Sequence, residues 1–405
     1  MHICFATIDY DYHEHEGRAG GGIASYVNTI GQALVARGHQ VTVIAGGSES
    51  DYRDEQGIHV VRVPLGNLHW YFYKLHAPSI AVLPVRELEW SWTFRRQLDN
   101  LLAEESIDVV EGCETGFLFV ADMRGSLPPL IVRLHGEDYV YSKYGGQRIS
   151  LGVRVNRQME LIALRRAAAC TSPSRFHAEE VARDLGWSPE RTCVIPNPIS
   201  PGLLAQALSD ESSVVGHRSP VVLYTGRIEH RKGTLPLLRS IPRVAEVFPE
   251  IQYVIVGGQH TSIDDRTLNK VMSEDNIGNH VRRTGYVPWQ QLLDWYRRAS
   301  VFVMPSYYEV FGISVIEAMA FGLPVVATTA GGLPEVVEDG VTGILVPPGD
   351  SRALADAIMR LLHDPSLRRR MGEAGRERVL AEFTVDRVAE RTIEVYTGVL
   401  ERHNP

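Results

Sequence analysis

The sequence VFVMPSYYEVFGISVIEAMAFGLPVVAT, residues 301–328, contains the pattern that decides the fold. A short run of β-branched and apolar residues, Val301–Met304, predicts a buried strand, and a helix is expected to begin near Ile313. A second apolar run, Pro324–Ala327, predicts the next strand. A strand, a helix and a strand in succession are typical of a parallel sheet that helices cover on both faces.

The same alternation of strands and helices extends through both halves of the chain. A helix is predicted over Ile23–Arg37, where apolar residues recur at helical spacing before Gly38. Further strands are predicted at His2–Thr7, Gln40–Ala45, His59–Pro64, Asp108–Gly112, Leu130–Leu134, Val221–Thr225, Tyr253–Val256 and Gly343–Val346. The sequence therefore predicts an α/β protein with two Rossmann-like, doubly wound domains facing each other across a cleft. Ligands of such sheets bind at the carboxyl ends of the strands.

A proline-rich segment separates the two halves. The sequence IPNPISPG, residues 195–202, contains three prolines and is followed by the polar stretch 209–220, which together indicate a linker. We expect one domain over residues 1–198 and a second over residues 199–384. A last helix, Val385–Arg402, is predicted after a break near residue 383.

Composition excludes several classes of protein. The 405 residues carry 41 basic and 49 acidic side chains, and a net charge of −8 argues against a nucleic-acid binder. No apolar run reaches the roughly 18 residues of a membrane span, and the first residues lack a secretion-signal pattern. The four cysteines lie far apart and form no CxxC pair. A disulfide framework is therefore not indicated, and we expect a cytoplasmic location.

A glycine-rich turn, GRAGGG at residues 17–22, lies between the first strand and the first helix. Such a turn can bring backbone N–H groups close to phosphate oxygens. The turn resembles the dinucleotide motif GxGxxG only loosely. The second strand also ends in Ala45-Gly46-Gly47 instead of the acidic residue that binds a ribose, so NAD is disfavoured. Phosphate binding and an ordinary surface turn are equally good interpretations.

The segment YTGRIEHRKGT, residues 224–234, places Arg227 and Lys232 between a strand and the next helix. Two cations at such a turn can bind a diphosphate, arginine through its planar fork and lysine as a point charge. Lysine is rare in this chain, since only four of the 41 basic residues are lysine. Its presence beside Arg231 favours a specific role, although a solvated basic turn is the alternative.

Two carboxylates, Glu309 and Glu317, are separated by seven residues in EVFGISVIE. Glu309 precedes a Phe-Gly turn, and Glu317 lies in the second turn of the predicted helix. The backbone N–H groups of Ile313 and Ser314 at the helix start are suited to a phosphate. The carboxylates can each accept hydrogen bonds from sugar hydroxyls. A glycosidase pair would instead have to face one another across the scissile bond.

Together these segments resemble the retaining glycosyltransferases of family 4, which have the GT-B fold. The resemblance rests on Glu-x7-Glu, GRIEHRKG, the glycine-rich first loop and GGLPEVVEDGVTG, residues 331–343. It implies transfer of a sugar from a nucleoside-diphosphate donor with retention, without an essential metal or other cofactor. It also implies that the last helix, within residues 385–405, completes the amino-terminal, acceptor-binding domain, and that residues 199–384 bind the donor.

The resemblance implies roles for individual residues. Glu309 would bind hydroxyls of the donor sugar, Glu317 the ribose, and Arg227 and Lys232 the diphosphate. His135, in LHGEDY, would lie near the reacting sugar and joins Glu309, Arg227 and Lys232 as a catalytic candidate. The implied donor-binding set is Gly21, Gly22, Arg227, Lys232, Tyr286, Val287, Glu309, Gly312, Ile313, Ser314, Val315 and Glu317.

The acceptor side is less defined. His13, His15 and Asp138 are acceptor-side candidates, and a mobile loop is favoured over a metal site for the HEHE sequence, which lacks a third spaced ligand. The aromatic segment 70–74 and the sequence EWSWTFRR, residues 89–96, favour core packing and an amphipathic helix over contact with a membrane. The chain departs from the family in having Asn197-Pro198 where Asn-Gly is usual, which predicts a different linker turn.

The expected reaction is transfer from a UDP- or GDP-linked sugar to an acceptor hydroxyl, in the synthesis of a glycan, a glycolipid or a glycosylated small molecule. Cations and helix N–H groups aimed at the growing phosphate charge are expected to provide most of the catalysis. A phosphorylase or a nucleotide-sugar epimerase of the same architecture is an alternative. A non-catalytic subunit that binds sugar nucleotides is another.

Overall fold

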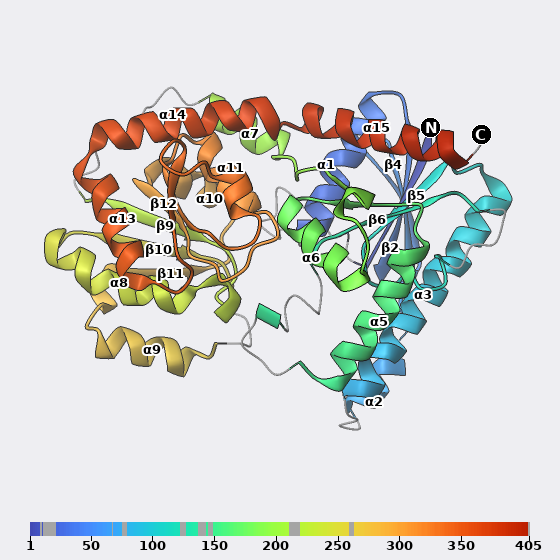
Figure 1. The fold of residues 1–405 in the computed structure, drawn as a ribbon, viewed down its shortest axis with the longest axis horizontal. Coiled ribbons are helices and arrows are strands. Elements are labelled where there is room, and N and C mark those ends of the chain that lie inside the picture. Colours follow the sequence, from blue (N-terminus) through green and yellow to red (C-terminus); the bar gives the residue numbers. More distant parts are fainter. Residues whose placement is uncertain are drawn as a thin grey trace.

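A computed structural model describes residues 1–8, 10, 22–66, 68–74, 79–121, 127–136, 143–144, 149–209, 219–258 and 263–403. Within these ranges the strands form two sheets, one in each half of the chain (Figure 1). We call the parts built on these sheets the first unit and the second unit. The predicted α/β fold with two doubly wound sheets is confirmed, because all neighbouring strands are parallel except β3 and β4 at one edge.

The first sheet has the strand order β3-β4-β2-β1-β5-β6-β7-β8. Its strands are β1 His2–Thr7, β2 Gln40–Gly47, β3 Asp51–Glu55, β4 Ile58–Pro64, β5 Val109–Gly112, β6 Leu130–Arg133, β7 Ala169–Ser172 and β8 Thr192–Val194. The edge strand β3 was not predicted, because its sequence DYRDE is polar throughout and shows no apolar alternation. It pairs antiparallel with β4 through a tight turn at Gln56 and Gly57, both of which have positive φ.

The second sheet has the order β11-β10-β9-β12-β13-β14. Its strands are β9 Val221–Thr225, β10 Gln252–Val256, β11 Val281–Gly285, β12 Val301–Met304, β13 Val325–Thr328 and β14 Gly343–Val346. Strands β9 and β12 are direct neighbours, with Val301 opposite Val222 and Phe302 opposite Leu223. The turns that follow these two strands therefore emerge side by side at the carboxyl edge of the sheet.

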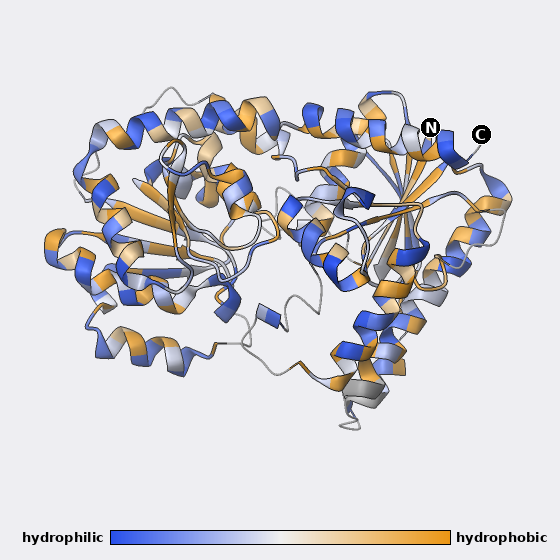
Figure 2. Cartoon of the chain, in the orientation of Figure 1, coloured by the Kyte–Doolittle hydropathy of each residue, from blue (hydrophilic) through white to orange (hydrophobic). Residues whose placement is uncertain are grey.

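Helices cover both sheets. Those of the first unit are α1 Gly22–Ala36, α2 Leu68–Lys74, α3 Ser79–Glu104, α5 Leu151–Arg166 and α6 Arg175–Leu185. The helices that follow are α7 Pro201–Leu208, α8 Thr234–Val247, α9 Asp265–Glu274, α10 Trp289–Arg298, α11 Ile313–Ala320, α12 Leu333–Val336, α13 Ser351–His363, α14 Pro365–Glu382 and α15 Val385–His403. Apolar residues concentrate in the strands and on the inner helix faces (Figure 2). None of the described helices has the length and apolar character that crossing a bilayer requires.

The chain passes between the units twice. The predicted linker contains the short helix α7, whose Leu203 and Ala207 belong to the apolar core of the second unit. Helix α15 returns to the first unit and packs beside α1, where Val388 and Tyr396 join the core formed with β1 and β2 (Figure 1). The two passages are joined, because the backbone N–H of Ile199 donates to the carbonyl oxygen of Phe383 at 2.8 Å.

A buried arginine anchors the first passage. Arg133, at the end of β6, is fully buried, and its Nη2 donates to the carbonyl oxygen of Ile195 at 2.9 Å and to Oδ1 of Asn197 at 2.8 Å. Its guanidinium lies 3.9 Å from the centre of the Tyr26 ring. The buried Glu111 accepts a hydrogen bond from the Tyr396 hydroxyl at 2.8 Å. Burial raises the pKa of Glu111, and the nearby charge of Arg133 opposes that rise. Strands, linker and last helix thus meet at one buried charge.

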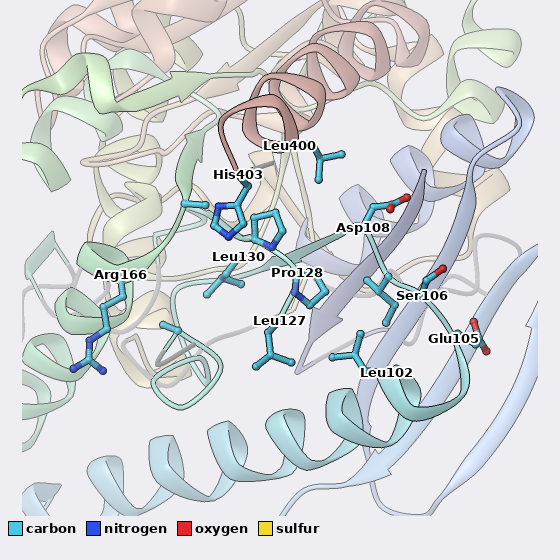
Figure 3. A pocket seen from close by; sticks show the side chains of 14 residues that line it. Leu102, Glu105, Ser106, Asp108, Leu127, Pro128, Leu130, Arg166, Leu400 and His403 are labelled. Atoms are coloured by element: carbon cyan, nitrogen blue, oxygen red, sulfur yellow. The ribbon is translucent and has the colours of Figure 1, made fainter. Parts of the chain in front are cut away.

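A cavity of about 650 Å³ lies at the amino ends of the strands of the first sheet, opposite the expected ligand site. Figure 3 shows the side chains that line it. Its lining includes Asp108, which precedes β5, and Leu130, which begins β6, together with Leu400 and His403 of α15. These are the amino ends of the strands. Ligands of doubly wound sheets bind at the carboxyl ends, so this cavity is not our candidate site.

We expect Arg133→Leu to destabilise the protein by about 3–5 kcal/mol, because it leaves the buried oxygens of Ile195 and Asn197 without the guanidinium that donates to them. The control is Arg243→Leu, which breaks an ion pair with Asp356 whose side chains are 46% and 47% exposed. That change is expected to cost less than about 1 kcal/mol. Urea unfolding followed by circular dichroism measures both, and equal losses in the two variants would contradict the anchoring role of Arg133.

Candidate active site

Glu309 lies in the loop between β12 and α11, and close backbone contacts fix the position of this loop. The N–H of Gly332 donates to the Glu309 carbonyl oxygen at 2.8 Å. At Gly331, whose φ is +60°, an added Cβ atom would lie 2.0 Å from the same oxygen. Only glycine therefore fits at residue 331. The first two residues of the GGLPE sequence thus hold the Glu309 loop in place.

Lys232 binds Glu309 directly. The ammonium group of Lys232, in the turn after β9, donates to Oε2 of Glu309, and the two side chains are only 14% and 12% exposed. Gly233 follows with φ of +70°, and a Cβ there would lie 1.8 Å from the Pro305 carbonyl oxygen. The turns after β9 and β12 are thus held together by a close backbone contact at Gly233 and by the ion pair of Lys232 with Glu309.

The charges of this pair depend on each other. Burial alone would raise the pKa of Glu309, but Lys232 and Arg231 hold it below its ordinary value. Burial lowers the pKa of Lys232, and the carboxylate of Glu309 opposes that shift. Near neutral pH the pair is therefore an ammonium bound to a carboxylate. Removing either partner would leave the other as an uncompensated buried charge.

Glu229 orients the other cations of the basic turn. Its buried carboxylate accepts a hydrogen bond from Nη2 of Arg231 at 2.7 Å and lies 3.7 Å from Nη2 of Arg227. Arg231 also donates to the Tyr308 carbonyl oxygen at 3.0 Å, so it helps to fix the loop that carries Glu309. Arg227 has a side chain that is 39% exposed, which leaves its guanidinium accessible at the carboxyl edge of the sheet.

Glu317 projects from α11 and is held by a residue that sequence reasoning missed. The hydroxyl of Tyr296, from α10, donates to Oε2 of Glu317 at 2.7 Å and lies 3.1 Å from the Thr225 hydroxyl at the end of β9. Burial raises the pKa of Glu317, and the bond from Tyr296 opposes that rise. Tyr296 is fully buried in the core of the second unit. In the sequence it is indistinguishable from any aromatic core residue of a helix, so its contact with Glu317 could not be predicted.

Helix α11 begins at Ile313, as predicted, after Gly312 with φ of +102°. The N–H groups of Ile313 and Ser314 belong to its first turn, where no intrahelical acceptor is available. Val315 is buried beneath them. Gly22 of the first unit approaches the same point, because a Cβ added there would lie 3.7 Å from Cδ1 of Ile313.

Tyr286 and Val287 follow β11 at the same edge of the second sheet. Tyr286 is 72% exposed and lies over Gly258, where an added Cβ would be 2.2 Å from the tyrosine ring. Val287 is half-buried against the second core. The exposed ring of Tyr286 thus lies beside Gly258, whose carbonyl oxygen accepts a hydrogen bond from the N–H of Ile228 in the turn that carries Arg227.

His135 follows β6 and is held by a carboxylate that sequence reasoning also missed. The N–H groups of His135 and Gly136 donate to the two oxygens of Glu114 at 2.8 and 3.0 Å. Burial and the charge of Arg133 lower the pKa of His135 to about 3, so its ring is neutral at pH 7. Burial alone would raise the pKa of Glu114, but the nearby His177, together with His135 and its backbone N–H, lowers it to about 2. Glu114 follows the buried strand β5, a position that could have indicated it.

Several predicted residues lie outside the described residues, namely Gly21, His13, His15 and Asp138. Within the described ranges, no group of three His, Cys, Asp or Glu side chains is placed to hold a metal ion. The aromatic region corresponds to α2 and α3, where Phe94 is buried and Trp92 is 62% exposed.

The described candidates thus gather at the carboxyl edges of both sheets. The second unit contributes one arginine, one lysine, two carboxylates and the start of a helix, and the first unit contributes a neutral histidine. Cations and helix N–H groups suit a diphosphate, and carboxylates suit hydroxyl groups. This set of groups can bind a sugar linked to a diphosphate and stabilise negative charge on the phosphate as the sugar departs.

Two family models match the chain. The model described as Glycosyltransferase Family 4 matches residues 20–203, and the model described as Glycosyl transferases group 1 matches residues 206–378. The chain is 34% identical to alpha-maltose-1-phosphate synthase of Mycolicibacterium smegmatis over 272 residues, which are 62% of this chain and 69% of that protein.

Solved structures have the same architecture. Sucrose-phosphate synthase of Thermosynechococcus elongatus gives a TM-score of 0.78 at 25% identity, covering 99% of this chain and 100% of that chain. The Anabaena protein HepE, solved in complex with UDP-glucose, gives a TM-score of 0.69 at 19% identity over 98% of this chain and 100% of that chain. The second likeness concerns the fold alone.

The low pKa of Glu114 predicts a pH-dependent contribution to stability. Because the folded value of about 2 lies below the ordinary value of 4.5, the contribution is present above pH 4.5 and is lost as the pH falls toward 2. The shift corresponds to about 3 kcal/mol. Glu114→Gln should therefore be less stable than the wild type by about that amount at pH 7, and the difference should shrink below pH 4.5.

Urea unfolding between pH 7 and pH 3 measures this difference. Glu373→Gln, on the exposed side of α14, is the control and should follow the wild type at every pH. A difference between Glu114→Gln and the wild type that does not change with pH would contradict the assignment.

Proposed function

The chain belongs to glycosyltransferase family 4, whose members are retaining enzymes of the GT-B fold, and from this premise we propose that it transfers a sugar from a UDP- or GDP-linked donor to an acceptor hydroxyl without a metal ion. That it is a glycosyltransferase with a nucleotide-sugar donor follows from the family. The observation that supports the finer proposal is the buried Lys232–Glu309 pair, which joins a cation suited to phosphate to a carboxylate suited to sugar hydroxyls.

The donor is proposed to lie along the carboxyl edge of the second sheet. Arg227 and Lys232 bind the diphosphate together with the first N–H groups of α11, because these donors come from adjacent turns. Glu317 accepts hydrogen bonds from the ribose hydroxyls, and its bond from Tyr296 leaves Oε1 for that purpose. The backbone at Tyr286 and Val287 contacts the base.

The sugar is proposed to lie between the two units. Glu309 accepts hydrogen bonds from sugar hydroxyls through the oxygen that Lys232 does not occupy. His135 is neutral, so its ring can accept or donate a hydrogen bond next to the reacting carbon without adding a positive charge there. This matters because the sugar ring itself becomes positively charged as the bond to phosphate breaks.

The proposed reaction is a front-face displacement. The bond between the anomeric carbon and the β-phosphate oxygen breaks, and a bond to the acceptor oxygen forms on the same face. The acceptor proton moves to the departing phosphate oxygen, which becomes the terminal oxygen of the nucleoside diphosphate. Arg227, Lys232 and the α11 N–H groups stabilise the charge that grows on that phosphate, which is the main catalytic contribution.

The proposal has a direct binding test. We expect one of UDP, GDP, ADP and TDP to raise the thermal unfolding midpoint, since a ligand at 100 times its Kd adds about 2.7 kcal/mol to the native state. UDP is tested first, since the Anabaena protein of similar fold was solved with UDP-glucose. The shift should persist in EDTA and disappear in Lys232→Ala. A shift that EDTA abolishes would contradict metal-independent binding, and no shift with any nucleotide would contradict the donor class.

Glu309→Gln tests the mechanism. The change keeps the size of the side chain but removes the charge that faces the sugar, so turnover should fall on the order of 10²-fold. Steady-state release of the nucleoside diphosphate measures it, and Glu250→Gln on the exposed surface is the control. The variant should give no glycosyl azide when azide is added. Detection by mass spectrometry of a sugar bonded to Glu309 in the wild type would contradict front-face attack.

A further inference from the structure

The contact between the two units centres on a tyrosine beside Glu309. Tyr308 belongs to the second unit, but its hydroxyl lies 2.8 Å from Nδ1 of His177 and 2.8 Å from Oε2 of Glu180, both on α6 of the first unit. The three side chains are 1%, 1% and 4% exposed. A tyrosine hydroxyl with two polar partners from another unit is more than apolar packing requires.

The hydrogen atoms in this contact can be assigned. Burial alone would raise the pKa of Glu180, but bonds from Lys143, Tyr144 and Tyr308 hold it below its ordinary value, so the carboxylate is an acceptor. Tyr308 therefore donates its single hydroxyl proton to Glu180. It follows that Nδ1 of His177 carries a hydrogen and donates it to the Tyr308 oxygen.

The contact continues to the other side of the site. Nε2 of His177 lies 3.7 Å from Oε1 of Glu114, the carboxylate that accepts hydrogen bonds from the backbone of His135 and Gly136. Buried polar groups thus follow one another from the backbone of His135, through Glu114 and His177, to Tyr308. The step from Glu114 to His177 is a close approach of 3.7 Å and not a hydrogen bond. Glu309 is the next residue in the chain.

The two units also contact each other at the same place without the tyrosine hydroxyl. The carboxylate of Glu335 accepts hydrogen bonds from the N–H groups of Arg175 and Phe176, at 2.7 and 2.8 Å, and so caps α6. At Gly136, an added Cβ would lie 2.5 Å from Cγ2 of Val310. The loop that contains Glu309 is therefore held on the first unit by other contacts. The hydrogen bonds of the Tyr308 hydroxyl further fix how this loop is oriented against α6.

We propose that Tyr308 is a positioning residue that fixes Glu309 of the second unit relative to His135 of the first, so that both reach the donor sugar in one arrangement. The inference rests on the proposed function, because it concerns the same sugar site. Small displacements of groups that orient a substrate reduce turnover strongly, up to about 10²-fold for 1 Å. The side chains proposed to bind the nucleotide, Arg227, Lys232 and Glu317, all belong to the second unit, so nucleotide affinity is expected to depend little on this contact.

The test compares Tyr308→Phe with the wild type in two measurements on the full chain. The first is the Kd of the free nucleoside diphosphate by calorimetry, which should change less than about twofold, since Arg227 and Lys232 are untouched. The second is release of that nucleotide from UDP-glucose, GDP-mannose or ADP-glucose, whichever the wild type accepts. Its kcat should fall about tenfold or more. Tyr253→Phe removes a buried hydroxyl from β10 and should leave both values unchanged.

A double-mutant cycle tests whether the polar groups act in series. If Glu114 and Tyr308 act through His177 on one arrangement, Tyr308→Phe combined with Glu114→Gln should lower kcat no further than the worse single change. Multiplying effects would contradict a shared action.

The outcomes separate the two proposals. An active wild type with an unchanged kcat in Tyr308→Phe overturns the positioning role alone. Parallel losses of kcat and nucleotide affinity also overturn it, since they indicate a general disturbance of the second unit. A wild type that binds no nucleotide and releases none from any donor overturns the proposed function, and the positioning role falls with it.

Discussion

The ion pair between Lys232 and Glu309 is the contact on which the arrangement of the site depends. A buried charge must be paired, so the two turns that carry these residues cannot move independently. The sheet places the turns together because they follow the adjacent parallel strands β9 and β12. Gly233 and Gly331 then permit backbone approaches that no other residue would allow. Topology, glycine and charge thus combine to place a cation and a carboxylate next to each other.

The first unit uses charge differently. Its buried groups hold backbone segments in place: Glu114 binds the N–H groups after β6, and Arg133 binds the oxygens of the linker. Both lie at the carboxyl ends of central strands, where a doubly wound sheet exposes its loops. The result is a neutral His135 whose position is fixed by a neighbouring carboxylate. In the proposed reaction, the second unit therefore supplies the charges for the donor, and the first supplies a fixed, uncharged partner.

Sequence patterns predicted the strands well because buried parallel strands are short apolar runs, and β9, β12 and β14 begin and end at the predicted residues. Four strands were missed, namely β3, β7, β8 and β11, because β3 is polar throughout, β11 has one strongly apolar residue, and β7 and β8 are too short to show a period. Helix α7 within the proline-rich linker was also missed. At the site, local motifs indicated Glu309, Glu317, Arg227 and Lys232. The partners Tyr296, Glu114 and His177 were missed because their contacts join segments far apart in sequence, and no spacing encodes them.

The linker turn shows why a departure from a family pattern need not disturb the fold. Proline at residue 198 cannot donate a backbone hydrogen bond. Here the linker is held by acceptors, because the carbonyl oxygen of Ile195 and the side chain of Asn197 both receive hydrogen bonds from Arg133. The next available donor, the N–H of Ile199, binds the carbonyl oxygen of Phe383. The first passage is thus fixed to the first unit before Pro198 and joined to the second passage just after it.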